Sequence, residues 1–151
     1  MVESSRILVI DDDKTIRLTI AAILRSEGYF VDTAETGMEA IEKSKANTYN
    51  LALIDIRLPD IMGTELLTKL RETIPPMVKI IVTGFPALQN TIDALNKGAN
   101  AYILKPVEPQ KLVDLVKVWL KKQEESKIYN QLKVTDARAR VTVAWSFKDD
   151  Q

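Results

Sequence analysis

The sequence contains no cysteine and no histidine. The missing cysteines exclude disulfide bonds, thiolate nucleophiles and thiolate metal sites. The missing histidines exclude the commonest general base, the usual zinc ligand and a phosphohistidine on this chain. Any chemistry must therefore use carboxylates, hydroxyls, basic side chains and bound ions.

The sequence also lacks an excess of charge of either sign and a long hydrophobic run. Lys plus Arg equals Asp plus Glu at 21 each, so no net charge attracts nucleic acid or an anionic membrane. The apolar run Ile7–Ile10 is far too short for a signal sequence or a membrane span. We therefore expect a cytoplasmic protein that binds neither nucleic acid directly nor a membrane.

Short apolar runs alternate with segments of helical period along the 151 residues. The predicted strands are Ile7–Ile10, Phe30–Thr33, Leu51–Ile54, Lys79–Val82 and Ala101–Leu104. The predicted helices are Lys14–Glu27, Thr36–Ala46, Gly63–Thr73 and Leu88–Lys97, with a last helix that begins near Pro109. Five repeats of strand and helix predict an α/β fold, a doubly wound five-stranded parallel sheet with helices on both faces.

Polar residues follow four of the predicted strands, at the point where each strand ends. They are Asp11-Asp12-Asp13, Asp55, Thr83 and Lys105. The carboxyl ends of parallel strands meet at one edge of the sheet, where open α/β folds form their sites. We therefore expect these acids, a hydroxyl and an ammonium to share one crevice.

A cluster of carboxylates needs a positive charge nearby to offset the repulsion between its members. Two carboxylates about 4 Å apart repel by roughly 4 kcal/mol at an effective dielectric constant near 20. A divalent cation relieves this repulsion, and all-oxygen ligation suits Mg²⁺, which also pairs with phosphate oxygens. A carboxylate at such a site can attack phosphorus, while Lys105 and Thr83 contact the phosphoryl oxygens.

Four motifs carry a resemblance to a known family. They are Val9–Asp13, Leu53–Asp60, Ile81–Gly84 and Tyr102–Pro106. In this order and spacing they resemble the receiver domains of response regulators in two-component signalling, over roughly residues 5–122. The resemblance implies the flavodoxin-like strand order 2-1-3-4-5, for which a family member is the usual example.

The resemblance also implies roles for single residues. Asp55 is expected to accept a phosphoryl group from a histidine kinase or phosphotransfer protein, with Thr83 and Lys105 on the phosphoryl oxygens. The Mg²⁺ ligands are expected to be Asp12 and Asp55 directly, Asp11 through water, and the backbone carbonyl of Arg57. Thr83 and Tyr102 are expected to act as the switch, and the Lys105–Pro106 bond is expected to be cis.

The implied output is a change in the face made by the fourth helix, the fifth strand and the fifth helix. The chain would then catalyse only its own phosphorylation and dephosphorylation. Two features stay open. Tyr102 is equally well explained as a half-buried structural aromatic, and Arg57 and Phe85 flank the expected path of the hydrolytic water, which leaves the lifetime of the phosphorylated state undetermined.

Two other functions compete with this interpretation. Asp11, Asp13 and Thr15 fit the first motif of haloacid-dehalogenase-like phosphatases, in which Asp11 would be the nucleophile, but Asp55 would then have no role. The second alternative is a receiver-like binding module that never takes a phosphoryl group. A DNA-binding regulator within this chain is not expected, because residues 123–151 are too few to build a helix-turn-helix domain.

We predict a receiver domain over residues 1–122, followed by a helical extension and tail of unknown role over 123–151. Lys121–Lys127 has helical character, whereas the alternating residues in Arg140–Lys148 predict a strand. The tail is either a linker remnant or a segment that docks on its own domain or across a homodimer. A downstream effector domain is a further possible partner.

Overall fold

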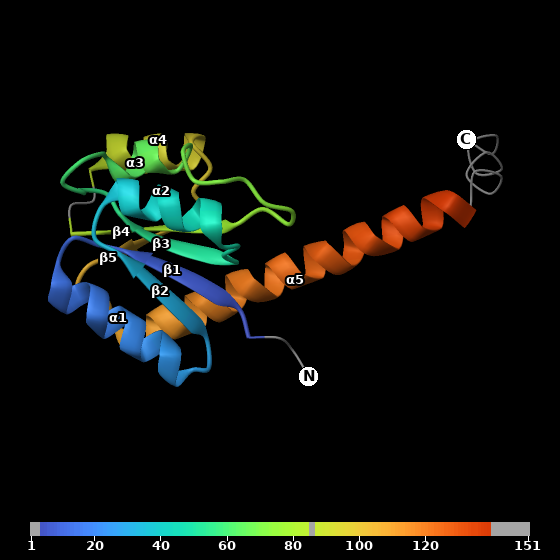
Figure 1. Ribbon diagram of the computed structural model, residues 1–151, viewed down its shortest axis with the longest axis horizontal. Helices are drawn as coiled ribbons and strands as arrows, with labels where there is room; N and C mark the ends of the chain where they lie inside the picture. The colour runs from blue at the N-terminus through green and yellow to red at the C-terminus, as the bar shows by residue number, and fades with distance from the viewer. Residues whose placement is uncertain (1–3, 85–86, 140–151) are drawn as a thin grey trace.

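The computed structural model describes residues 4–84 and 87–139. Its centre is a five-stranded parallel sheet in the order β2-β1-β3-β4-β5 (Figure 1). The strands are β1 (Arg6–Ile10), β2 (Phe30–Ala34), β3 (Leu51–Asp55), β4 (Val78–Thr83) and β5 (Ala101–Leu104). The helices are α1 (Lys14–Ser26), α2 (Gly37–Ala46), α3 (Gly63–Leu66), α4 (Leu88–Asn96) and α5 (Pro109–Ala139). The predicted fold class and strand order are confirmed.

Helices cover the sheet on both faces. Helices α1 and α5 lie on one face, and α2, α3 and α4 lie on the other (Figure 1). Because successive strand residues point to opposite faces, Leu51 and Leu53 of β3 belong to the core under α1 and α5, and Ala52 and Ile54 to the other core. Both faces of β3 are therefore buried, which explains why its sequence is continuously apolar.

The strand register brings the carboxyl ends together. Ile10 pairs with Ile54, so the acids that follow β1 lie beside Asp55 at the end of β3. Asp55 in turn pairs with Val82, the residue before Thr83. The chain adds β2 on one side of β1 and β3 on the other, so the strand order reverses between β1 and β3. Ligands bind at this switch point in this class of fold.

The predicted third helix is much shorter than expected. A helix over Gly63–Thr73 was predicted, but α3 ends at Leu66 and turns follow it. The apolar face was predicted correctly, because Leu66, Leu67 and Leu70 are all buried. Two side chains donate hydrogen bonds to carbonyls that would accept backbone N–H groups in a longer helix. Thr68 Oγ1 donates to Glu65 O, and Lys79 Nζ donates to Leu67 O. These contacts favour tight turns over a regular helix.

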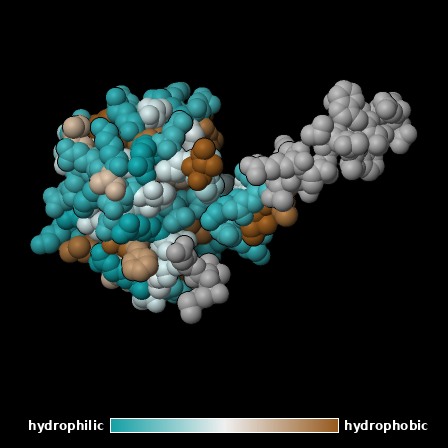
Figure 2. All heavy atoms as spheres, turned by 45° about the vertical axis from the view of Figure 1, so that its right-hand side comes forward, coloured by the Kyte–Doolittle hydropathy of each residue, from teal (hydrophilic) through white to brown (hydrophobic). Residues whose placement is uncertain are grey.

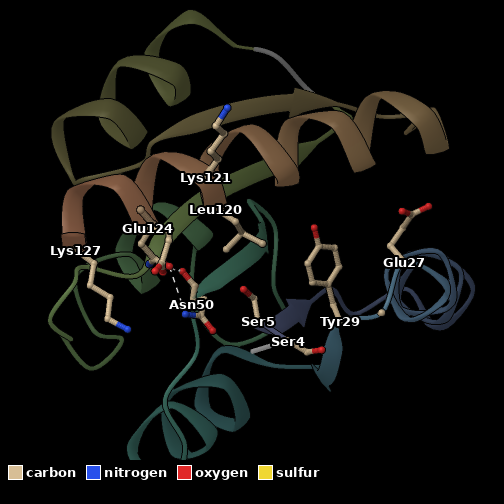
Figure 3. A pocket seen from close by; sticks show the side chains of 11 residues that line it. Ser4, Ser5, Glu27, Tyr29, Asn50, Leu120, Lys121, Glu124 and Lys127 are labelled. Atoms are coloured by element: carbon tan, nitrogen blue, oxygen red, sulfur yellow. Dashed lines mark hydrogen bonds between the residues drawn. The ribbon is translucent and has the colours of Figure 1, made fainter. Parts of the chain in front are cut away.

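Helix α5 continues without a break through the predicted domain boundary and projects away from the sheet (Figure 1). Gln123 still belongs to the body of the protein, because its Nε2 donates to the carbonyls of Asn50 and Pro76 at 2.9 Å each. A groove of about 860 Å³ opens beside this contact, between α5 and the amino-terminal ends of the strands (Figure 3). The boundary at residue 122 remains a prediction, and the predicted strand Arg140–Lys148 lies outside the described residues.

Beyond the sheet, α5 carries exposed hydrophobic side chains. Ile128, Tyr129 and Leu132 are 47%, 65% and 60% exposed, and Figure 2 shows hydrophobic residues on the surface of this part of the helix. No helix in residues 4–84 and 87–139 combines the length and the apolar character needed to cross a membrane.

Candidate functional site

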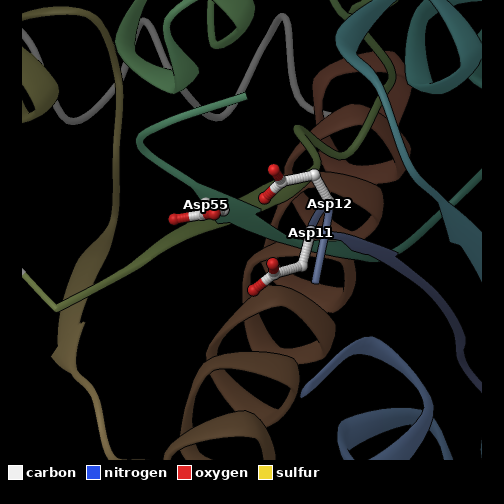
Figure 4. A group of neighbouring side chains, drawn as sticks. All are labelled: Asp11, Asp12 and Asp55. Carbon is white, nitrogen blue, oxygen red and sulfur yellow. The ribbon is translucent and has the colours of Figure 1, made fainter. Parts of the chain in front are cut away.

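Three carboxylates meet at the carboxyl edge of the sheet. Asp11 and Asp12 follow β1, and Asp55 ends β3 (Figure 4). Each offers an oxygen that lies within 4.8 Å of the other two. Asp11 and Asp55 are only 2% and 8% exposed, whereas Asp12 is exposed to solvent. The sequence prediction that these three acids converge is confirmed.

The turn between β1 and α1 is fixed by its own polar groups. Asp11 N donates to Ala34 O of β2 at 3.1 Å, and Asp13 N donates to Asp11 Oδ1 at 2.9 Å. Asp13 caps α1, since its Oδ1 accepts from Ile16 N at 3.0 Å. Asp13 therefore starts a helix, while Asp11 and Asp12 face the site.

Lys105 brings a positive charge to the acids. It follows β5, its backbone N–H donates to Thr83 O at 2.8 Å, and its bond to Pro106 is cis as expected. Its Nζ lies 2.9 Å from Asp11 Oδ2 and 3.5 Å from Asp55 Oδ1. One ammonium thus contacts two of the three carboxylates.

The pKa shifts of Asp55 and Lys105 indicate that Lys105 does not fully compensate the charge of the carboxylates. Burial raises the pKa of Asp55 to about 6, and the Asp11 carboxylate acts in the same direction. Lys105 and a hydrogen bond from the Arg57 backbone oppose this rise without cancelling it. Burial on its own would lower the pKa of Lys105, but its contacts with Asp11 and Asp55 outweigh burial and raise that pKa. A further cation would stabilise the ionised acids.

The other predicted residues lie on β4, on β5 and in the loop after β3. Thr83 is buried at the end of β4. Arg57 is exposed in the loop after β3, where its backbone pairs with Met62. Tyr102 packs against the core on the α2–α4 side, and its buried hydroxyl has no hydrogen-bond partner among the described residues. The interior position of Tyr102 fits both a structural and a switching role.

Three residues near the site were not singled out as functional from the sequence. Arg17 donates from Nη1 to Asp11 O at 2.9 Å, Asp60 accepts two backbone N–H groups from α2, and Gly63 packs on the Asp55 backbone. Arg17 had a usable signal, because it falls among the core-facing residues of α1 with Ala21 and Leu24. The contacts of Asp60 and Gly63 depend on tertiary structure and leave no local pattern.

This arrangement suits one type of chemistry. Asp11, Asp12 and Asp55 present hard oxygen ligands of the kind that Mg²⁺ prefers, and Lys105 can hold an anionic group beside Asp55. A buried carboxylate in such surroundings is a competent nucleophile toward phosphorus.

Comparison with known proteins identifies the family. Residues 7–117 match the family described as response regulator receiver domain. The transcriptional regulatory protein ResD of Bacillus subtilis is 33% identical over 127 residues, covering 83% of this chain and 52% of ResD. ZraR of Klebsiella oxytoca is 34% identical over 110 residues, covering 73% of this chain and 25% of ZraR. The chain thus spans a quarter to a half of these curated relatives.

A solved structure agrees with this result. The CheY-like receiver domain protein of Methanospirillum hungatei is 46% identical, with a TM-score of 0.79, and the match covers 82% of this chain and 99% of that one. The haloacid-dehalogenase alternative and the binding module without phosphorylation are not favoured by these matches.

Proposed function

The chain belongs to the family of response regulator receiver domains, the phosphorylation-dependent switches of two-component signalling, and on that premise we propose that Asp55 accepts the phosphoryl group. The observation that carries this assignment is the convergence of three carboxylates with one ammonium. Asp55 is the acid at the centre of the sheet, and its Oδ1 lies 3.5 Å from Lys105 Nζ.

Mg²⁺ fits the donor set of this site. Asp12 and Asp55 would hold it directly, Asp11 through water, and the Arg57 carbonyl would complete the protein ligands. A bound Mg²⁺ would neutralise the carboxylates and act as a Lewis acid on phosphoryl oxygens. Exposed Asp12 leaves one side of the cluster open to solvent, so an ion and a phosphodonor can both enter.

The protein groups then divide the work of phosphoryl transfer. A carboxylate oxygen of Asp55 attacks phosphorus, the P–N bond of a phosphohistidine breaks, and the imidazole nitrogen keeps the electron pair. Lys105 binds one phosphoryl oxygen as a point charge, and the Thr83 hydroxyl donates to another. In this proposal the chain catalyses only its own phosphorylation and dephosphorylation.

The output is a population shift between two conformations of the face formed by α4, β5 and α5. Thr83 and Tyr102 connect the site to this face, since Thr83 pairs with Leu104 and Tyr102 with Ile81 across β4 and β5. Exposed hydrophobic residues on all three elements support a contact surface there: Ile92, Leu95, Leu104 and Val118. Phosphorylation can shift the equilibrium only by its differential interaction with the two states.

The partners follow from this mechanism. We propose a histidine kinase or phosphotransfer protein as phosphodonor, and a homodimer or a downstream effector domain as the receiver of the signal. The exposed Ile128, Tyr129 and Leu132 on α5 support a protein contact beyond the sheet. A cytoplasmic location and the absence of direct nucleic-acid binding remain predictions from the sequence.

The assignment is tested with a small-molecule acyl phosphate and Mg²⁺, followed by intact mass. Wild-type protein should gain one phosphoryl group, Asp55→Asn should gain none, and excess chelator should prevent the gain. Asp93→Asn, which changes a partly exposed acid on α4, should behave as wild type. A phosphoryl group that persists in Asp55→Asn but disappears in Asp11→Asn would overturn the assignment.

A further inference from the structure

The junction between β2 and α2 contacts both loops that carry the site acids, although it supplies none of those acids. We define this junction as residues 35–38. It meets the turn after β1 through Arg17 and the loop after β3 through Asp60. These two contacts point to a function for residues that lie outside the carboxylate cluster.

The first contact runs through a buried arginine. Arg17 is 5% exposed, and its Nη1 donates to Asp11 O at 2.9 Å while its Nη2 lies 3.1 Å from Glu35 Oε1. Glu35 is held in turn, because its backbone N–H donates to Glu39 Oε2 at 3.0 Å. The guanidinium therefore fixes the peptide group between Asp11 and Asp12 relative to the junction.

The second contact runs through Asp60. Its Oδ1 accepts from Gly37 N and its Oδ2 from Met38 N, each at 2.9 Å, which joins the loop after Asp55 to the first turn of α2. The two segments are in close contact, since a Cβ on Gly37 would lie 2.1 Å from Ile61 Cγ2. Both carboxylate oxygens of Asp60 thus accept hydrogen bonds from the N-terminus of α2, where a negative charge is favourable.

We propose that Glu35, with Arg17, and Asp60 are positioning residues that hold the two acid-bearing loops at a fixed separation across the junction. This inference rests on the proposed function. The reason is electrostatic: Asp11, Asp12 and Asp55 bring three carboxylates within 4.8 Å of one another. The ammonium of Lys105 contacts only two of them, Asp11 and Asp55. Without the two contacts the loops relax apart, and the oxygens no longer converge on a cation.

The alternative is that these contacts only stabilise α2. The chain offers a matched control, because Thr36 caps the same helix by accepting from Glu39 N at 3.1 Å but contacts neither acid-bearing loop through that bond. Thr36→Ala therefore weakens the start of α2 and leaves the two contacts in place. Glu42→Ala is the second control, since it removes an exposed negative charge from α2.

The test uses Mn²⁺ as the probe, with binding to the full chain followed by electron paramagnetic resonance and folding followed by melting temperature. Glu35→Ala and Asp60→Ala change exposed residues, so these variants should fold. We expect each to weaken Mn²⁺ binding by about tenfold, the scale of outer-shell effects on metal sites, while Thr36→Ala and Glu42→Ala change it less than twofold. The Mg²⁺ concentration that half-saturates the phosphorylation rate should rise by the same factor.

The outcomes separate this inference from the proposed function. Mn²⁺ binding in Asp60→Ala that equals that of Thr36→Ala overturns the positioning role, even when wild-type protein is phosphorylated on Asp55. Wild-type protein that binds no Mn²⁺ and accepts no phosphoryl group instead contradicts the proposed function itself.

Discussion

At the scale of the residue, the site places the carboxylates of Asp11, Asp12 and Asp55 close together, and their mutual repulsion lowers the stability of the folded protein when no metal is bound. The types of the central residues were readable from the sequence, because Asp11, Asp12 and Lys105 follow strands and Asp55 ends one. Their pairing was not readable: no local pattern shows that Lys105 contacts Asp11 at 2.9 Å and Asp55 at 3.5 Å. The position of Arg17 among the core-facing residues of α1 was readable, but its contact with Asp11 O was not, because that contact depends on tertiary structure.

Asp55→Asn should stabilise the metal-free protein at neutral pH. The folded-state pKa of Asp55 is about 6 against an ordinary value of 3.8, so the ionised carboxylate opposes folding above pH 6. We expect a gain of about 1–2 kcal/mol at pH 7 in excess chelator, allowing for solvent screening, and the gain should vanish below about pH 4 as Asp55 becomes protonated in both states. Denaturant unfolding at several pH values measures this. A loss of stability at pH 7, or a gain equal to that of exposed Glu42→Gln, would contradict it.

At the scale of the element, the sequence predicted where strands and helices begin better than where they end. The start of the third helix at Gly63 was correct, but its end was wrong by seven residues, Leu66 against Thr73. Two contacts compete with a longer helix: Thr68 Oγ1 donates to Glu65 O, and Lys79 Nζ of β4 donates to Leu67 O. A contact between residues twelve positions apart cannot be seen in helical periodicity.

Gly63→Ala should destabilise the fold although alanine favours helices. A Cβ at this position would lie 2.2 Å from Asp55 O and 2.8 Å from Ile56 Cα, and backbone atoms cannot move aside cheaply. The helix preference for alanine is worth about 1 kcal/mol. Overpacking against backbone atoms should lie at the upper end of its usual range, about 3 kcal/mol, so we expect a net loss of about 2 kcal/mol. Thermal or denaturant unfolding measures the loss. Gly84→Ala is the control, because among the described residues its Cβ would meet only Lys105 Cβ, at 4.0 Å. Equal stability of the two variants would show that α3 tolerates the displacement.

At the scale of the whole molecule, α5 packs on the sheet at its start and projects away from it at its end. The continuous helix runs through the predicted end of the domain, and Gln123 fastens it to the loops before β3 and β4. The sequence indicated a helical extension, but it gave no sign that Gln123 reaches two carbonyls 73 and 47 positions away. The sequence around a glutamine in a charged helix is the same whether its side chain is solvated or hydrogen-bonded to another part of the protein.

Truncation after Lys122 should lower stability more than truncation after Leu132. The shorter protein loses both hydrogen bonds that Gln123 donates, each worth about 0.5–1.5 kcal/mol, so we expect a deficit of about 1–3 kcal/mol relative to the longer one. Gln123→Ala in the full chain should reproduce most of this deficit, whereas Glu125→Ala on the exposed side should not. Phosphorylation of Asp55 should persist in all four proteins. Identical unfolding curves for the two truncated proteins would place the end of the folded domain before Gln123.

The central claim is that Asp55, and not another acid of the cluster, carries the phosphoryl group. Borohydride reduces an aspartyl phosphate to homoserine, and peptide mass spectrometry then locates the changed residue in wild-type protein. After treatment with Mg²⁺ and a small-molecule acyl phosphate, we predict homoserine at position 55 and unchanged aspartate at positions 11 and 12. Homoserine at position 11 with unchanged Asp55 would contradict the assignment and favour a phosphatase-like nucleophile.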